Sequence, residues 1–371
     1  MERKNEEERK IVPDMPQMRS VMIGAPRTMP LPPRSLLRSG PPTTKSAPGA
    51  IRKPVGAKWA PKDIPALPDF YPLERTHAIV EDTPVDEVAT RVASALRECS
   101  LAPTFEGHKA SAETQCHVRL VVQLFTQGEK IVVEVQRRCG CSFVYRQIAK
   151  SVIKAVKGGK VKVPAPRALP KVPKSIFKEE DRKQECEEAL EIAADLITKE
   201  SFDSQLLGIQ SLAQLTAGDA TKVQAAKTIL RGPIYESVLS FIRPLGDEEE
   251  TKDDSMTEHR GNMKMDAFSV LANCFSAVSG KISFDGIAND ELLEMIIEQL
   301  RTADETPHSA CHAARALKAL LTSSEAVKLR ADQLDAAAAV LLAHKEGVNR
   351  HLMLEEVTKY LKEEVYPGIE M

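Results

Sequence analysis

The sequence predicts a multidomain protein: a disordered N-terminal tail, then a small α+β domain with two helices on an antiparallel sheet, then an all-α solenoid. Three observations predict this order. Fourteen of the 24 prolines occur at or before Pro72. Residues 74–157 alternate between strand-like and helix-like patterns, whereas residues 180–365 show only helical spacing of apolar residues. A basic, proline-rich linker at 158–178 separates the two folded parts.

Charge divides along the chain near the same place. Residues 1–178 hold 31 basic and 17 acidic residues, a net charge of +14, and residues 179–371 hold 20 basic and 36 acidic residues, a net charge of −16. The total of −2 hides both values. Two halves of opposite charge favour two surfaces with different partners.

Composition and missing motifs exclude several classes of protein. The seven cysteines are odd in number and scattered, which is typical of reduced intracellular thiols. No apolar run approaches the roughly 20 residues that span a bilayer, and residues 1–10 lack the apolar core of a signal peptide. No catalytic motif or phosphate-binding glycine loop occurs. We therefore expect no enzyme activity, no cofactor and a cytoplasmic, peripheral-membrane or nuclear location.

The tail, residues 1–70, has too little apolar surface to offset its ordering entropy, so we expect disorder. Residues 27–33 match the R-x-x-P-x-x-P pattern of a polyproline ligand for SH3-type grooves, a pattern that also arises by chance in such tails. Trp59, the only tryptophan, either anchors the tail on a domain or is an ordinary tail aromatic; the second interpretation is favoured.

The α+β domain is expected over residues 74–157. The Thr83-Pro84 pair predicts a helix start, and the apolar spacing that ends at Val156 predicts a second helix. Residues 109–115 are expected to be a polar connection. The other elements follow in order: a strand at 76–81, a helix at 84–99, a weak strand at 102–108, two strands at 116–126 and 130–138, and a helix from residue 145.

A basic stripe marks the outer face of the second helix. No acidic residue occurs between Glu134 and Glu179, although an ordinary soluble face mixes both signs. A solvated helix face is the alternative to a binding role. We expect the stripe to bind an anionic surface. Its candidate residues are Arg137, Arg138, Arg146, Lys150, Lys154 and Lys157.

Residues 128–149 resemble the C-terminal half of a KA1 (kinase-associated 1) domain. That family ends in a strand, an arginine, an x-Gly-x-Ser turn and an aromatic-anchored helix. The matching positions are Val133, Val135, Arg137, Gly140, Ser142, Tyr145 and Ile148. The resemblance implies binding of anionic phospholipid through Arg137, Arg138, Arg146 and Lys150. No kinase motif precedes it, so an adaptor is expected in place of an inhibitor acting in cis.

Nucleic acid is the competing ligand for the same stripe. The strands lack the paired aromatic residues with which an RRM stacks bases, and no G-x-x-G loop marks a KH fold. Phe125, Phe143 and Tyr145 are the only stacking candidates. Lipid is therefore favoured over nucleic acid.

Three segments in the helical part resemble one another. Their central leucines, Leu212, Leu271 and Leu317, are 59 and then 46 residues apart. The second spacing is close to the roughly 40 to 47 residues of armadillo and HEAT repeats, with the acidic loop at 247–254 as an insertion in the first. A non-repeating bundle is the alternative. The helices are expected at 182–199, 203–217, 219–231, 234–242, 263–279, 286–302, 308–323, 326–343 and 349–364.

In armadillo repeats an asparagine holds an extended peptide in the concave groove. The resemblance implies this role for Asn273, while Gln214 and Ala319 stand at the matching positions. The negative charge of the helical part, including acidic stretches at 179–188 and 247–254, favours a basic partner. We therefore expect a protein partner in a groove that contains Asn273 and Gln214.

Two histidine and cysteine sets have the residue types of a metal site. Cys116 and His117 could meet Cys139 and Cys141 if their strands pair, and His308, Cys311 and His312 share one helix face. Cys-x-Cys is a tight spacing for structural zinc, and no glutamate follows His308 as in a metalloprotease. We expect no metal at either place.

These observations favour a non-enzymatic adaptor or scaffold. The KA1-like part would bind anionic membrane and the helical repeats a protein. The alternatives are a nucleic-acid-associated protein that uses the same stripe, and a regulatory subunit of a kinase or other enzyme.

Overall fold

The first folded part is a five-stranded antiparallel sheet. The computed structural model describes residues 58–161, 179–244, 254–284 and 286–368. Along the sheet the strands follow the order β1-β5-β4-β3-β2. Their bounds are β1 His77–Val80, β2 Thr104–Glu106, β3 Lys109–Glu113, β4 Arg119–Gln127 and β5 Lys130–Cys139. The SH3-type motif at 27–33, linker residues 162–178 and the acidic loop residues 247–253 lie outside the described residues.

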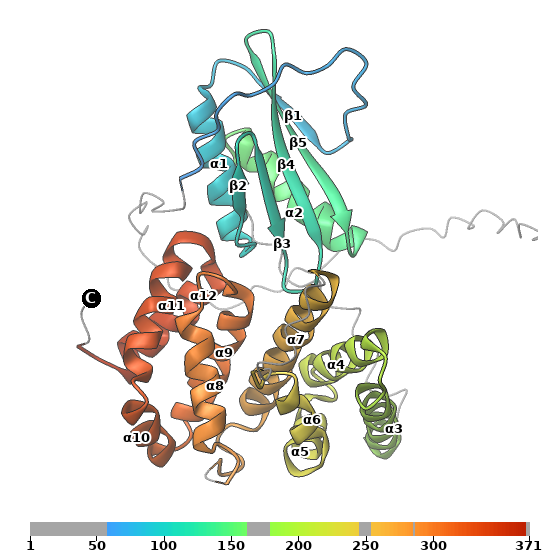
Figure 1. Cartoon of the computed structure of the whole chain (residues 1–371), viewed down its shortest axis with the longest axis vertical. Coiled ribbons are helices and arrows are strands. Elements are labelled where there is room, and N and C mark those ends of the chain that lie inside the picture. The colour runs from blue at the N-terminus through green and yellow to red at the C-terminus, as the bar shows by residue number, and fades with distance from the viewer. Residues whose placement is uncertain (1–57, 162–178, 245–253, 285, 369–371) are drawn as a thin grey trace, which may run out of the picture. The chain divides into compact units, whose positions relative to one another are not determined.

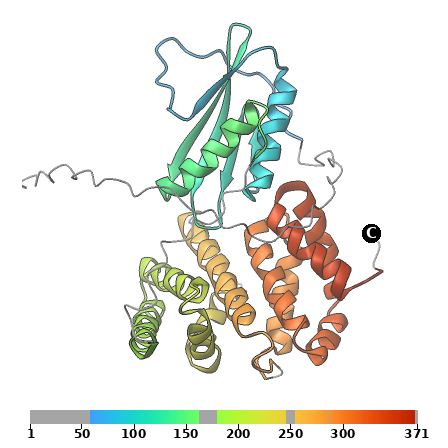
Figure 2. The same ribbon diagram turned by 180° about the vertical axis from the view of Figure 1, so that it is seen from behind.

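Two helices cover one face of this sheet, as the sequence predicts. They are α1 (Val85–Glu98) and α2 (Ser142–Val156), which pack against each other on the same side (Figures 1 and 2). Alternate residues of β4 and β5, such as Leu124 and Val133, point into the core beneath the helices. The hairpin turns at Gly128, whose positive φ of 61° suits glycine.

The expected polar connection at 109–115 is wrong. Residues 109–113 form β3, which pairs with β4 so that Ala110 lies opposite Val122 and Ala112 opposite Leu120. Ala110 and Ala112 are buried while their neighbours face outward. Alanine has a weak strand preference, so this strand depends on its position in the sheet more than on its own sequence.

The segment from Trp59 to Leu67, which we expected within the tail, packs against the sheet instead. Trp59 is only 5% exposed. Its ring stacks on Phe105 with centroids 5.4 Å apart, and its indole nitrogen donates to the Gly107 carbonyl at 2.9 Å. The Leu67 backbone nitrogen donates a hydrogen bond to the Thr126 carbonyl at the end of β4, at 2.8 Å. Trp59 is therefore an anchor, because one large ring fills the sheet edge that short β2 leaves open.

The uncovered face of the sheet receives the segment before β1. Glu134 is fully buried on this face. Its carboxylate accepts from the Glu74 backbone nitrogen at 2.6 Å, from the Gln136 amide at 2.7 Å and from the Tyr71 hydroxyl at 3.1 Å. Three donors compensate the burial of this charged group. Tyr71 also packs on Phe125 with ring centroids 5.2 Å apart, so that Phe125 is not an open platform.

The second folded part is mostly helical, as expected. Helix α7 packs against α4 and α9, so the three helices that carry the similar segments lie side by side (Figure 1). Their assignment to armadillo repeats stays a prediction. The helices are α3 Glu179–Ile197, α4 Phe202–Ala217, α5 Lys222–Arg231, α6 Ile234–Ser240, α7 Asp254–Val278, α8 Asp290–Arg301, α9 Pro307–Leu321, α10 Glu325–Gln333, α11 Ala336–Arg350 and α12 Leu352–Tyr360. None of these helices combines the length and apolar content that a bilayer-spanning segment requires.

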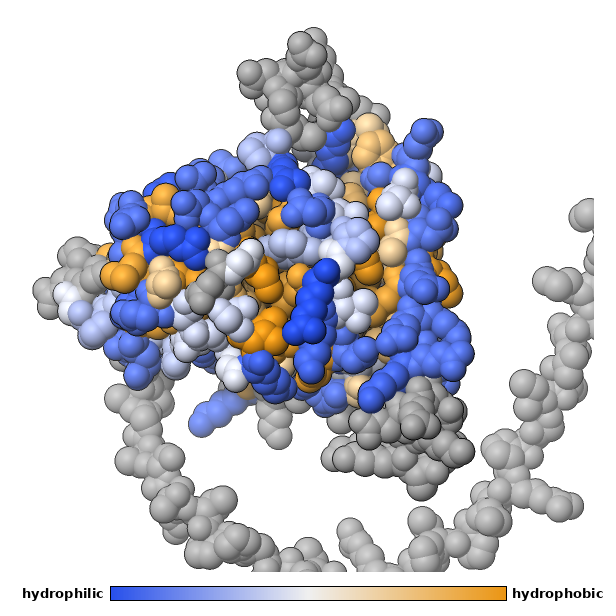
Figure 3. Space-filling view, turned by 90° about the horizontal axis from the view of Figure 1, so that it is seen from below, coloured by the Kyte–Doolittle hydropathy of each residue, from blue (hydrophilic) through white to orange (hydrophobic). Residues whose placement is uncertain are grey.

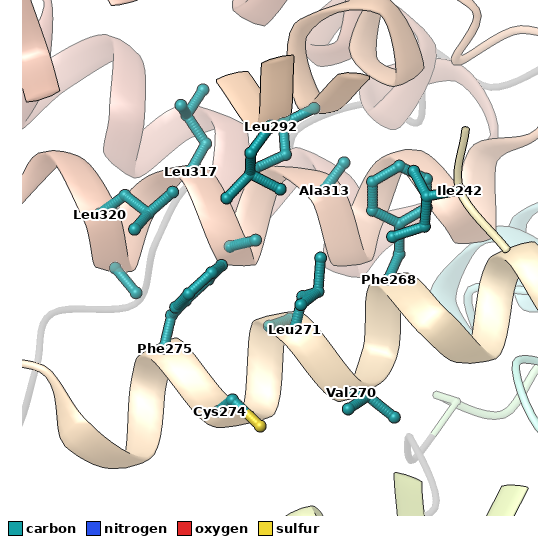
Figure 4. Close-up of a cluster of buried hydrophobic side chains, with 14 of the residues drawn as sticks. Ile242, Phe268, Val270, Leu271, Cys274, Phe275, Leu292, Ala313, Leu317 and Leu320 are labelled. Atoms are coloured by element: carbon teal, nitrogen blue, oxygen red, sulfur yellow. The ribbon is translucent and has the colours of Figure 1, made fainter. Parts of the chain in front are cut away.

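The core between α7 and α9 is built from aromatic and leucine side chains of α7 that face leucine and alanine side chains of α9. Residues of α7 that point toward α9 are Phe268, Leu271 and Phe275, and those that meet them from α9 are Ala313, Leu317 and Leu320 (Figure 4). Val270 and Cys274 lie on the other side of α7 in the same view. Such interlocking fixes the spacing of neighbouring helices.

The single helix expected at 326–343 is in fact two, α10 and α11. Asp335 between them has a φ of 60°, a left-handed conformation that aspartate tolerates better than most residues. The helix expected at 349–364 is α12 followed by a π-helical turn, Leu361–Val365. The left-handed Asp335 and the π-helical turn are backbone conformations that the spacing of apolar residues does not predict.

The sheet and the helices belong to one compact unit and contact each other directly. Arg97 at the end of α1 pairs with Glu355 of α12 and donates to the Val348 carbonyl at 2.6 Å. On the β3–β4 connection, His117 lies 3.0 Å from the Asp266 carboxylate of α7. We call these contacts, together with those of His308 of α9 to the Glu113 carbonyl and the His351 ring, the junction; they join the first part to α7, α9, α11 and α12.

Candidate anionic-surface site

The position of α2 is fixed by its buried face. Tyr145 donates its hydroxyl hydrogen to the Val135 carbonyl of β5 at 2.6 Å. Ile148, Val152 and Val156 are buried against the sheet and α1. A helix anchored on one face must present the opposite face outward, which is where the sequence places the basic stripe.

The outer face of α2 carries cations and one aromatic ring. Arg146, Lys150, Lys154 and Lys157 are all exposed, and no carboxylate of the described residues forms an ion pair with them. Phe143 in the first turn is 65% exposed. At 100° per residue these five side chains fall within an arc of roughly 80° along about 21 Å of helix. We call them the α2 face.

Arg137 and Arg138 are not brought together with the α2 face in the same way. Arg137 donates to the Gly140 carbonyl at 2.6 Å, which commits it to the turn before α2. Arg138 is exposed at the next position of β5 and therefore points to the opposite side of the sheet. There its positive charge acts on the Tyr71 hydroxyl. Of the six predicted residues, the three on α2 and Lys157 at its C-cap therefore form one surface.

The turn before α2 has a specific need for glycine. Gly140 has a φ of 86°, and a Cβ there would lie 2.6 Å from the His117 carbonyl oxygen and 2.7 Å from the Val118 Cα. Cys141 precedes the helix, and the backbone N–H groups of Val144 and Phe143 lower the pKa of its thiol. This close approach sets the angle at which α2 leaves the sheet.

The residues of the two candidate metal sets have other partners. Cys116, Cys139 and Cys141 are exposed and form no disulfide; the Cys116 thiol lies 3.2 Å from the Thr114 hydroxyl, and the Cys139 thiol donates to the His117 carbonyl at 3.8 Å. His308 bonds the Glu113 carbonyl at 2.9 Å and the His351 ring at 3.0 Å, so it belongs to the junction. Within the described ranges, no three His, Cys, Asp or Glu side chains converge as metal ligands.

The two predicted groove residues are on neighbouring helices, but only one lines a cleft. The Asn273 amide nitrogen donates to the Ala213 carbonyl at 3.4 Å, and its oxygen accepts from Arg315 at 2.9 Å. Its amide is therefore engaged by the neighbouring helices. Gln214 of α4 is exposed and is not among the residues lining the cleft around Asn273.

A larger cleft, of about 1220 Å³, lies elsewhere in the helical part. Phe202, Phe241 and Met295 contribute apolar lining, and charges of both signs surround them. Figure 3 shows hydrophobic residues reaching the surface among hydrophilic ones on the face seen from below. Sequence reasoning missed this cleft, because its lining comes from α4, α6, α7 and α8 together.

Comparison of the chain with protein-family models, with curated protein sequences and with solved structures finds no match.

Proposed function

We propose that this protein is a non-enzymatic adaptor that attaches to anionic membrane surfaces through the α2 face and holds a protein partner on its helical part. The observation that carries the proposal is the α2 face itself. Four exposed cations without ion-pair partners among the described residues lie beside an exposed phenylalanine. Such a combination suits a membrane interface, where lysine and arginine meet lipid phosphates and an aromatic ring enters the headgroup layer.

The rest of the first part supports lipid over nucleic acid. Base stacking by a sheet needs exposed aromatic rings. Here one face of the sheet is covered by α1 and α2, and on the other Phe125 is only 6% exposed beneath Tyr71. A convex helix face also offers no groove for a single strand.

The helical part supplies the partner surface in this proposal. Its net charge of −16 over residues 179–371 favours a basic protein. The cleft that contains Phe202, Phe241 and Met295 offers apolar anchoring positions of the kind found in protein interfaces. The protein would then join a partner to the inner surface of a membrane, a cytoplasmic role.

The membrane proposal predicts salt-sensitive binding to anionic vesicles. We expect the full chain to co-sediment with phosphatidylserine-containing vesicles and not with pure phosphatidylcholine, more strongly at about 50 mM than at about 150 mM salt. The substitutions Arg146→Glu, Lys150→Glu and Lys154→Glu together should weaken binding at least tenfold, since each cation contributes about 1 kcal/mol near such a surface.

A matched variant separates the α2 face from net charge. Lys183→Glu, Lys227→Glu and Lys345→Glu reverse three other exposed lysines, and this variant should bind nearly as the unmodified chain does. Absence of binding at low salt, or an equal loss in both triple variants, would contradict the proposal. Displacement by single-stranded RNA at low concentration, with vesicles ineffective as competitors, would favour nucleic acid instead.

Phe143 supplies a second, salt-independent test. We expect Phe143→Ala to weaken vesicle binding about threefold at every salt concentration, because the apolar contribution is not screened. Phe143→Leu keeps an apolar side chain and should retain most of the binding. If Phe143→Ala alters only the salt-sensitive part, the ring does not enter the bilayer.

A further inference from the structure

A second cleft, of about 740 Å³, lies where the β3–β4 connection meets the helical part. Three cationic side chains line it: Lys222 of α5, Lys281 after α7 and Arg315 of α9. Gln115, Asn273 and His312 add neutral polar groups, as do the hydroxyls of Thr216, Ser269 and Ser276, and none of the described residues that line the cleft is acidic. An all-cationic cleft is unexpected in a half of the chain whose net charge is −16.

Arg315 is held in place without a carboxylate. Its guanidinium donates to the Asn273 amide oxygen at 2.9 Å and to His312 Nδ1 at 3.2 Å. Both acceptors are neutral, and no ion pair of Arg315 occurs among the described residues. A half-buried arginine usually pairs with an anion, so here the positive charge remains available to a ligand.

His312 and Gln115 add neutral donors to the same cleft. Because His312 Nδ1 accepts from Arg315, the proton of this neutral ring lies on Nε2, which can donate. The Gln115 amide nitrogen is buried without a nitrogen or oxygen acceptor in the described part of the chain, and the weak Cys311 thiol is its neighbour. A thiol is a weak acceptor for a buried amide, and a phosphate oxygen would be a stronger one.

The two lysines are held only by weak surface contacts. Lys222 lies 2.8 Å from the carboxylate of Asp219, whose side chain is 97% exposed. Lys281 is exposed and donates to the Ala277 carbonyl at 3.0 Å. Surface pairs of this kind contribute little and exchange readily, so both ammonium groups can turn toward an anion.

We propose that this cleft binds a small molecule carrying at least two phosphate groups. Phosphate oxygens accept hydrogen bonds only, which matches a cleft that offers Arg315, Lys222, Lys281, His312 Nε2 and the Gln115 amide as donors. The volume of about 740 Å³ falls in the range of small-molecule sites. The site is separate from the α2 face and does not depend on membrane binding.

Calorimetric titration of the full chain at about 150 mM salt tests this site. The probes are inositol hexakisphosphate, ATP and inorganic phosphate. We expect one molecule of a polyphosphorylated probe per chain, with inorganic phosphate much weaker because it meets fewer of the three cations. Lys222→Ala with Lys281→Ala should weaken binding at least tenfold, and Arg315→Gln should do so independently.

Two control variants make the result specific. Lys227→Ala with Lys345→Ala removes two exposed lysines outside the cleft, and the triple α2 variant removes the membrane face; both should bind the probes normally. Vesicles containing phosphatidylinositol 4,5-bisphosphate, tested with the α2 variant, show whether the phosphates belong to a lipid headgroup or to a soluble molecule. No binding of any probe, or equal weakening in the cleft and control lysine pairs, would overturn the proposal.

Discussion

Replacing Gly347 by alanine is expected to lower the free energy of unfolding by about 3 kcal/mol. Gly347 lies in α11 where α12 crosses it, and an added Cβ would be 2.4 Å from the Glu355 backbone nitrogen and 2.8 Å from its Cα. Those atoms are backbone, so no side chain can rotate to relieve the contact. The two helices must separate, and α12 carries Glu355, which pairs with Arg97 at the junction.

A second glycine in a helix provides the control. Gly261 in α7 is exposed, and no atom of the described residues lies within 4 Å of the position its Cβ would take. Gly261→Ala should therefore raise the free energy of unfolding by about 0.5 to 1 kcal/mol through helix preference alone. Urea unfolding of both variants measures the contrast. Equal effects would show that α11 and α12 do not approach as closely as described.

Elements with strong local patterns could be predicted from the sequence, and elements defined by their neighbours could not. The apolar spacing that ends at Val156 predicted helix α2, and alternation of apolar residues predicted strands β4 and β5, each with the correct type and approximate position. In contrast, β3 is recognisable only through its pairing with β4, since Ala110 and Ala112 carry little strand signal. Trp59 illustrates the same limit, because its value as an anchor depends on Phe105, 46 positions away.

The candidate sites follow the same division. The α2 face occupies one helix, so its cations could be listed from their spacing, although the exposure of Phe143 could not. The phosphate-accepting cleft joins residues from the β3–β4 connection, α5 and α9. A single sequence does not show that Lys222, Lys281 and Arg315 converge, because no spacing relates them.

The junction contains histidines held in opposite charge states. His308 Nε2 donates to the Glu113 carbonyl, so its Nδ1 must accept from His351 Nε2, and His351 Nδ1 in turn accepts from the Leu354 backbone nitrogen. With both rings neutral, each of the four ring nitrogens has the protonation that its hydrogen bond requires, so this row of hydrogen bonds is complete. Burial is the main reason that the pKa values of His308 and His351 are lowered, and neighbouring histidines lower them further.

His117, on the same β3–β4 connection, behaves in the opposite way. Burial alone would lower its pKa, but the hydrogen bond to Asp266 and the negative charges of Asp266 and Glu113 raise it to about 9. Its Nε2 lies 3.0 Å from Asp266 Oδ2, and its Nδ1 lies 3.7 Å from Glu113 Oε1. The ring is therefore protonated at neutral pH.

Stability is expected to pass through a maximum near pH 6.5 and to fall on both sides. Below the unfolded histidine pKa of about 6.5, the unfolded chain binds more protons than the folded one at His308 and His351, so stability is lost as pH falls. Above it, the folded chain binds more protons at His117, so stability is lost as pH rises toward 9. The alkaline loss should reach up to about 3 kcal/mol, at 1.36 kcal/mol per pKa unit.

Single substitutions should remove the two limbs of this profile separately. The His117→Gln variant lacks the ring proton that Asp266 and Glu113 stabilise. The unfolding free energy of this variant should therefore change little between pH 6.5 and 9. His351→Asn can still accept from the Leu354 nitrogen at the start of α12 but cannot become protonated, so its acid limb should be shallower. Urea unfolding at half-unit pH steps measures both profiles. If His117→Gln leaves the alkaline limb intact, that limb arises from another group and His117 is not protonated in the folded chain.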